Sequence, residues 1–177
     1  MKSWIGILRA SGSLASTAGF ATAIFLATSP AFAAGAKIGA LIPLTGGLAQ
    51  YGESSLNGVK LAIKHINAQG GVLGGKLLLA VGDTKTNAQS GVAAAKQLVS
   101  LQGVSGIIGA LSSGVTIPVA TSVSSVEGVP QISNASTAPG ISTLNDKDFM
   151  FRTVAHDALQ GVVLGDIVKK RGISKVS

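Results

Sequence analysis

Two short runs of small and hydroxylated residues each follow a segment with the composition of a β-strand. The first, Ser112 to Gly114, comes shortly after the β-branched run Ile107 to Gly109. The second, Ala135 to Thr137, follows Gln131 to Ser133, a run announced by Val129 and Pro130. These residues include no strong base, no nucleophile with a histidine partner and no metal ligand. The chemistry they offer is hydrogen bonding to a polar ligand.

The ends of parallel strands bring such runs together. Ligands of open parallel sheets bind beyond the carboxyl ends of the strands, so Ser112 to Gly114 and Ala135 to Thr137 should line one crevice. Free N–H groups at the start of the helix after Gly114 favour an anion such as a carboxylate, and Ser113 can add a hydroxyl donor. Thr137 can donate and accept. The alternative is that these residues only cap helices and form turns.

The segment that opens this pattern is a strand over Ile38 to Ile42, which Pro43 ends. A glycine-rich loop over Leu44 to Tyr51 follows it, and then a helix that stops at Gly70 and Gly71. Apolar residues spaced as one face of this helix are Leu56, Val59, Ala62, Ile63 and Ile66.

A nearly continuous apolar run over Leu77 to Val81 predicts a strand that is internal and buried on both faces. Thr86 and Gln89 have the spacing of a capping box and predict the start of a second helix, which ends near Gly103. The apolar face of that helix is formed by Val92, Ala95, Leu98 and Val99. Strands and helices that alternate in this way predict an α/β fold with right-handed crossovers and a doubly wound parallel sheet.

The pattern changes after Pro139 to a loop that leads into Phe149 to Arg152, where we place a lobe boundary. A further helix is expected over Asp157 to Arg171, with basic residues near its carboxyl end that complement its dipole. Gly172 should end it, and Ile173 to Val176 resembles the beginning of a strand.

Several linked motifs carry a family resemblance. The runs GALSSGVTIPVA, GVPQIS and NASTAP, in this order, are similar to the leucine/isoleucine/valine-binding family, the substrate-binding proteins of branched-chain amino-acid ABC transporters. The resemblance begins at KIGALIPLTGGLAQYGESSLNGVKLAIKHINAQGG and closes with DKDFMFRTVAHDALQG, so it spans the chain after the first 33 residues.

The resemblance implies a two-lobed binding protein with the type I periplasmic-binding-protein fold. Residues 34–152 would form an incomplete N-terminal lobe, and residues 153–177 the crossover and the first helix of a second lobe. The ligand-binding residues implied are Tyr51, Ser113, Gly114, Ala135, Ser136 and Thr137.

Individual roles follow from the same resemblance. Ser113 would bind the ligand carboxylate, Thr137 both carboxylate and ammonium, and the Ala135 carbonyl the ammonium, while Tyr51 packs on the ligand side chain. Tyr51 could also be an ordinary packing residue. The partners implied are an amino acid and the membrane permease subunits of an ABC transporter, and the protein would act as a monomer. Relatives on this scaffold bind amides, urea or aromatic acids, and a sensory domain of a receptor is a further alternative.

The first 33 residues have the features of a signal peptide. Lys2 and Arg9 form a positive start, Phe20 to Ala27 a short apolar core, and Ala31 to Ala33 a small-x-small cleavage site after Pro30. We expect cleavage before Ala34 and a periplasmic protein. The chain has no cysteine, which excludes disulfides and a lipid anchor on cysteine.

Composition and spacing argue against other classes. The net charge of +7 includes Lys2 and Arg9, and only 4% of residues are aromatic, so a basic surface with stacking rings for nucleic acid is not expected. His65 and His156 combine with no acid in a catalytic or metal spacing. Gly109 to Gly114 has P-loop spacing but lacks the following lysine. We therefore expect neither an enzyme, such as a nucleotide-dependent one, nor a cofactor or metal.

Overall fold

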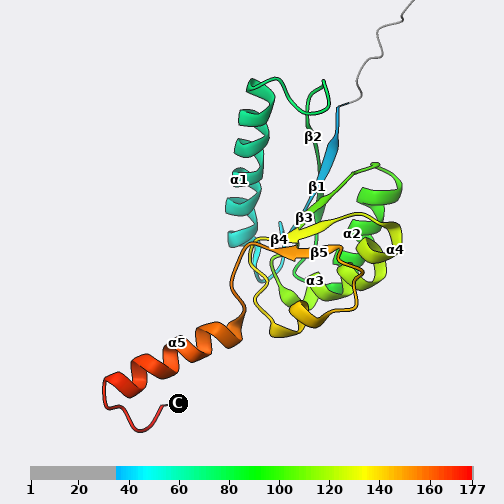
Figure 1. Cartoon of the computed structure of the whole chain (residues 1–177). Coiled ribbons are helices and arrows are strands. Elements are labelled where there is room, and N and C mark those ends of the chain that lie inside the picture. Colours follow the sequence, from blue (N-terminus) through cyan, green and yellow to red (C-terminus); the bar gives the residue numbers. More distant parts are fainter. Residues whose placement is uncertain (1–34, 177) are drawn as a thin grey trace, which may run out of the picture. The chain divides into compact units, whose positions relative to one another are not determined.

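Five parallel strands form one sheet in residues 35–176, the part of the chain that the computed structural model describes (Figure 1). The strands are β1 (Lys37–Ile42), β2 (Leu78–Asp83), β3 (Ile107–Gly109), β4 (Gln131–Ser133) and β5 (Met150–Arg152). Their order is β2-β1-β3-β4-β5, and every neighbouring pair is parallel. The predicted parallel α/β sheet is confirmed. The expected signal peptide, residues 1–33, lies outside the described residues.

The side on which successive strands are added to the sheet changes once, so the order of strands reverses between β1 and β3. From β1 the chain moves outward to β2, and it then returns to the other side of β1 for β3, β4 and β5. Loops that leave β1 and β3 therefore diverge, and in doubly wound sheets ligands bind in the crevice that opens at this point. The two runs of small residues, Ser112 to Gly114 and Ala135 to Thr137, follow the carboxyl ends of β3 and β4 and so lie at this edge of the sheet.

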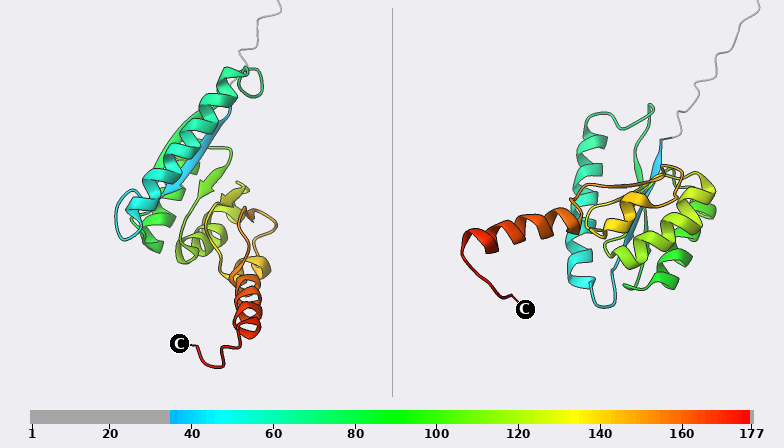
Figure 2. Two further views of the ribbon diagram at one scale, coloured as in Figure 1. Left: turned by 90° about the vertical axis from the view of Figure 1, so that its left-hand side faces the viewer. Right: turned by 60° about the horizontal axis from the view of Figure 1, so that its bottom comes forward.

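One face of the sheet is covered by α1 (Ala49–Ala68), which runs alongside β1 (Figure 2). Residues of α1 that pack on Ala40 and Ile42 of β1 include Leu56 and Val59, which recur at helical spacing. The helix ends just before Gly70 and Gly71, as predicted. Ala62, expected on the buried side, is exposed.

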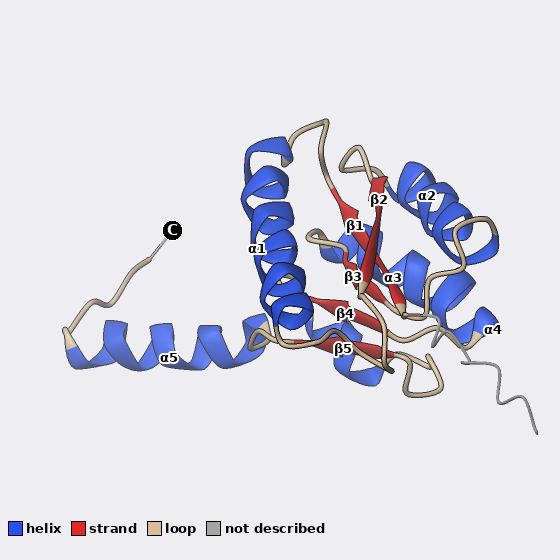
Figure 3. Cartoon of the chain, turned by 90° about the horizontal axis from the view of Figure 1, so that it is seen from above, coloured by secondary structure: helices blue, strands red, loops and turns tan. Residues whose placement is uncertain are grey.

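The opposite face is covered by α2 (Ala88–Ser100) and by a continuous helical stretch made of α3 (Ser113–Val119), η1 (Ala120–Ser124) and α4 (Ser125–Glu127). Figure 3 shows these helices on the side of the sheet away from α1. The main core lies here, where Leu41 and Ile107 of the sheet meet the helices. Helix residues of this core are Ala95, Leu98, Val115, Val119 and Val123.

Two predictions about the second strand and helix are wrong. β2 is an edge strand of the described sheet, not an internal one, and its Leu78 is 50% exposed. The apolar run was misleading because the crossover from β1 carries β2 to the outside. The helix α2 begins at Ala88 and is capped by Asn87, whose side chain accepts a hydrogen bond from Ser90 N–H at 3.0 Å. Thr86 instead bonds to the loop after β1.

The region after β4 also differs from expectation. Met150–Arg152, where the sequence analysis placed a lobe boundary and no strand, forms β5 and pairs with β4. Between them lies a 3-10 helix, η2 (Pro139–Thr143). The helix α5 (Asp157–Lys170) is present as predicted, with Lys169 and Lys170 in its last turn, but none of its residues is buried. Ile173 to Val176 forms no strand in the described part of the chain.

Candidate functional site

The loop after β4 is tied to the end of β3 by buried hydroxyl groups. Ser133 donates to the Ala110 carbonyl at 2.6 Å, and Ser136 lies within hydrogen-bond distance of the carbonyls of Ala110 (3.2 Å) and Leu111 (3.1 Å). The Ser136 and Thr116 hydroxyls are 2.7 Å apart. Ser136 is 0% exposed. Its side chain therefore fixes the loop, and the expectation that it lines the crevice is not supported by this geometry.

Ser113 connects the same loop to the first turn of α3. Its hydroxyl oxygen accepts a hydrogen bond from Ala138 N–H at 3.2 Å, which leaves the hydroxyl hydrogen free to be donated elsewhere. The N–H groups of Ser113 and Gly114 precede the first backbone bonds of α3, which run from Val115 and Thr116 to the Ser112 carbonyl. Ser113 is half-buried and Gly114 is exposed, so both border solvent.

Thr137 lies between two anchored peptide groups. Its carbonyl accepts a hydrogen bond from Asp157 N–H at 2.9 Å, at the start of α5. Within residues 35–176, neither its N–H group nor its hydroxyl has a hydrogen-bond partner, and the residue is half-buried. The carbonyl of Ala135 likewise has no donor in the described part of the chain. Two donors and an acceptor on Thr137 and Ala135 are therefore available to a ligand.

Tyr51 is on the first turn of α1, not in the preceding loop as expected, and it is 56% exposed. Gly52 allows α1 to start close to β1, since a Cβ atom at this position would lie 1.9 Å from the Pro43 carbonyl oxygen. Ser55, one helical turn after Tyr51, lies 3.3 Å from the Asn134 side-chain nitrogen. Because residues four apart share a helix face, Tyr51 lies on the side of α1 that meets the loop after β4.

A carboxylate at the end of β2 shapes the loop between β1 and α1. Asp83 accepts hydrogen bonds from the N–H groups of Leu44 (2.9 Å), Thr45 (3.2 Å) and Lys85 (2.8 Å), and from the Thr45 hydroxyl (2.6 Å). Burial favours a higher pKa for Asp83, but the hydrogen bonds outweigh it and hold the pKa below its ordinary value. Sequence analysis missed this role because an isolated aspartate carries no spacing signal.

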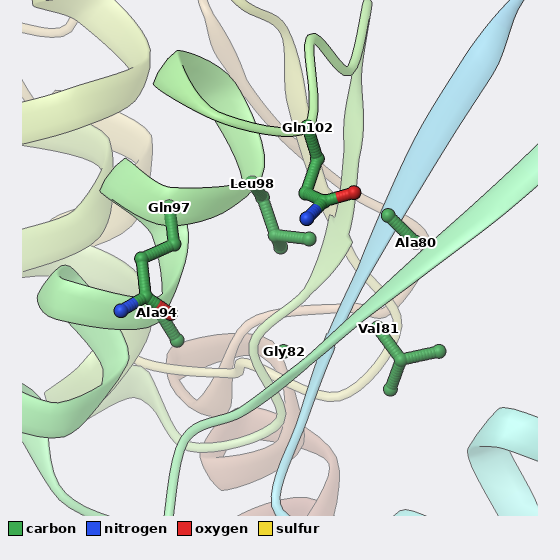
Figure 4. Close-up of a pocket in the computed structure, with 7 residues that line it drawn as sticks. All are labelled: Ala80, Val81, Gly82, Ala94, Gln97, Leu98 and Gln102. Atoms are coloured by element: carbon green, nitrogen blue, oxygen red, sulfur yellow. The ribbon is translucent and has the colours of Figure 1, made fainter.

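Two hollows of the described surface lie away from the predicted ligand residues. A cavity of about 200 Å³ lies between β2 and α2 (Figure 4), lined by Ala80, Val81, Gly82, Ala94, Gln97, Leu98 and Gln102. An apolar groove of about 300 Å³ lies on the sheet, lined by Ile38, Gly106, Ile107, Ile108, Pro130, Gln131, Ile132 and Phe151. Neither hollow is lined by any of the six candidates.

Residues 35–176 contain no group of histidine and acidic side chains suited to a metal ion. No helix in that range combines the length and apolar character that crossing a membrane requires.

The profile of the periplasmic binding protein family matches residues 35–177. The chain belongs to the periplasmic binding protein family. This confirms the resemblance found in the motifs. Among relatives of this binding protein, the Leu/Ile/Val-binding protein homolog 3 of Brucella melitensis is 34% identical over 163 residues, which cover 92% of this chain and 41% of that protein.

Solved structures match the same region. A branched-chain amino acid transporter substrate binding protein from Streptococcus pneumoniae, in complex with isoleucine, has a TM-score of 0.65 at 30% identity. The match covers 70% of this chain and 34% of the Streptococcus pneumoniae chain. A solute binding protein of an ABC transporter from Rhodopseudomonas palustris, in complex with 3,4-dihydroxy benzoic acid, has a TM-score of 0.69 at 27% identity. The match covers 78% of this chain and 37% of the Rhodopseudomonas palustris chain. The match with this periplasmic binding protein spans 41% of the Brucella melitensis relative and as little as 26% of other relatives' length.

Proposed function

We propose that this chain supplies one lobe of an extracytoplasmic substrate-binding protein that delivers branched-chain or related amino acids to an ABC transporter. The observation that carries the proposal is the pair of free donors on Thr137, its N–H and hydroxyl, next to the Ser113–Ala138 hydrogen bond that joins the loops after β3 and β4. Several relatives have names that specify leucine, isoleucine and valine.

Each ligand group has a matching protein group in this proposal. The carboxylate accepts hydrogen bonds from the Ser113 hydroxyl and Thr137 N–H, with Gly114 N–H as a further donor. The ammonium donates to the Ala135 carbonyl and the Thr137 hydroxyl oxygen. Hydrogen bonds between neutral protein groups and a charged ligand are stronger than neutral pairs, so three or four such bonds can orient a zwitterion.

Tyr51 contacts the ligand side chain in the same proposal. Its ring is exposed on the face of α1 that meets the Asn134 loop, so it can cover an aliphatic group without repacking the core. Residues 35–152 then form one wall of the site, and a second lobe closes over the ligand from the other side.

The remaining parts of the proposal concern the cell. The signal peptide directs export to the periplasm, where the monomeric protein binds its ligand, without chemical conversion, and meets the membrane permease.

Titration calorimetry of the full-length protein tests the ligand class with leucine, isoleucine, valine and 4-methylpentanoate. The last compound keeps the leucine carboxylate and carbon chain but lacks the ammonium. Leucine should bind at least about tenfold tighter, since a hydrogen bond to a charged group contributes about 1.5–3 kcal/mol.

A second ligand class has a specific observation in its favour, the neighbour in complex with 3,4-dihydroxy benzoic acid. An aromatic acid would use the carboxylate donors of Ser113 and Thr137 and stack on Tyr51, leaving the Ala135 carbonyl unused. Binding of 3,4-dihydroxybenzoate together with weak or absent binding of all three amino acids would favour this class and contradict the primary proposal.

A further inference from the structure

Arg152 ends β5 and holds the loop after β4 with its guanidinium group. It lies opposite Ser133 in the β4–β5 pairing and is half-buried. Its Nη1 donates to the carbonyls of Ala138 (2.9 Å) and Ser136 (3.4 Å), and its Nη2 donates to the Ser142 hydroxyl oxygen. All three acceptors are uncharged oxygens, so this side chain is used to arrange a loop.

The two carbonyls that Arg152 binds are those on either side of Thr137. Ser113 holds the same segment through Ala138 N–H. Ser136 N–H is also engaged, by the Ser133 hydroxyl at 3.0 Å. In the described structure, the N–H group of Thr137 is consequently the one backbone polar group between Ser136 and Ala138 without a partner.

We propose that Arg152 is a positioning residue of the ligand site, which orients the N–H and hydroxyl of Thr137 by holding the carbonyls of Ser136 and Ala138, the residues before and after it. The inference rests on the proposed function, because it assigns Arg152 to the same site. The planar guanidinium presents its N–H groups in a fixed arrangement that can bind several acceptors at once. The lysine ammonium is a compact charge at the end of a flexible chain. A loop held in its binding conformation beforehand avoids the entropy cost of being ordered by the ligand.

The main test replaces the planar guanidinium of Arg152 by an ammonium and keeps the positive charge. In the full-length protein, Arg152→Lys should weaken leucine binding by about three- to tenfold, the cost of ordering the loop on binding. Arg171→Lys, at an exposed position just after α5, is the matched control and should leave the affinity unchanged. Unchanged leucine affinity in the Arg152→Lys protein would overturn the proposal.

A double-mutant cycle separates positioning of Thr137 from a general structural role. Thr137→Val removes the hydroxyl and keeps the shape, so Arg152→Lys should weaken leucine binding less in this background than in the natural protein. In a Tyr51→Ala background the effect of Arg152→Lys should be undiminished. Equal losses in the Thr137→Val and natural backgrounds would contradict action through Thr137.

Two further measurements keep the test decisive. If Arg152→Lys does not fold, Ser142→Ala removes one exposed acceptor of the guanidinium and should weaken leucine binding in the same direction. In the ligand-free protein, ¹⁵N relaxation should show increased motion of the Thr137 and Ala138 amides in either variant, and unchanged motion would overturn the positioning role. This readout is independent of leucine, so failure of the natural protein to bind amino acids refutes the proposed function alone.

Discussion

The Ala138 amide donates to the Ser113 hydroxyl oxygen at 3.2 Å, which joins the loop after β4 to the first turn of α3. Ser113 accepts a hydrogen bond from the protein and keeps its own hydrogen for a ligand. Ser113 and Ala138 are 25 positions apart in sequence. Their hydrogen bond joins the two runs of small residues into one structural unit, so a change at Ser113 should affect both ligand contact and loop order.

Ser113→Ala in the full-length protein should weaken amino-acid binding by about tenfold or more, because a hydrogen bond to a charged group contributes about 1.5–3 kcal/mol. Titration calorimetry with leucine measures this. Ser100→Ala, at the exposed end of α2 and outside both runs, is the control. Equal affinities of Ser113→Ala and natural protein would remove Ser113 from the site.

Ser136→Ala should reduce stability. The Ser136 hydroxyl is buried against Thr116, Ala110 and Leu111, so its removal leaves polar groups without a partner and costs about 1–3 kcal/mol of unfolding free energy. Urea unfolding measures this cost, with Ser54→Ala, at an exposed position on α1, as the control. A stability equal to the natural protein combined with a large loss of leucine affinity would restore Ser136 as a ligand contact.

The Asp83 network should make stability depend on pH in acid solution. The hydrogen bonds hold the folded pKa of Asp83 below its unfolded value. Their contribution is therefore complete above the unfolded pKa and is lost as pH falls below it and through the folded pKa. Urea midpoints between neutral and strongly acid pH should decline less steeply in Asp83→Asn than in the natural protein. Asp166→Asn, on the exposed α5, is the control, and identical pH profiles for the natural protein and Asp83→Asn would contradict the assignment.

The first step of the proposed pathway can be checked by sequencing. If Ala31 to Ala33 is a cleavage site, the protein recovered from the periplasm should begin at Ala34. Amino-terminal sequencing decides this. Ala33→Leu, which removes the small residue before the cut, should leave the precursor uncleaved. Recovery of a protein that begins at Met1, attached to the membrane, would contradict export with cleavage.

The sequence predicted the parallel α/β alternation, because this alternation follows from local patterns. Periodic apolar residues located α1 and α2. Small residues after strand-like runs predict a ligand crevice, and this stays a prediction. The sequence could not show that Ser136 turns inward while Thr137 stays available, since a loop has no side-chain period from which to deduce direction. That distinction comes from contacts with Thr116 and Ala110, far along the chain.

Long-range partners explain the other failures. Arg152 and Asp83 act on loops through hydrogen bonds to the backbone, for which any residue can provide the acceptor or donor. Their partners therefore leave no signature in the sequence. The edge position of β2 was missed for a related reason, because the apolar run of an edge strand that packs on helices can match that of an internal strand.

The last prediction concerns the lobe by itself. A two-lobed protein gains affinity when it closes on its ligand and excludes water, whereas residues 34–177 alone leave the second face of the zwitterion in solvent. The groove on the sheet also leaves Ile132 39% and Phe151 50% exposed, and apolar surface of this kind favours aggregation. Residues 34–177 should be marginally folded and bind leucine, isoleucine or valine no tighter than millimolar. Circular dichroism during heating and titration calorimetry test this, and a sharp unfolding transition with micromolar binding would show that one lobe is sufficient.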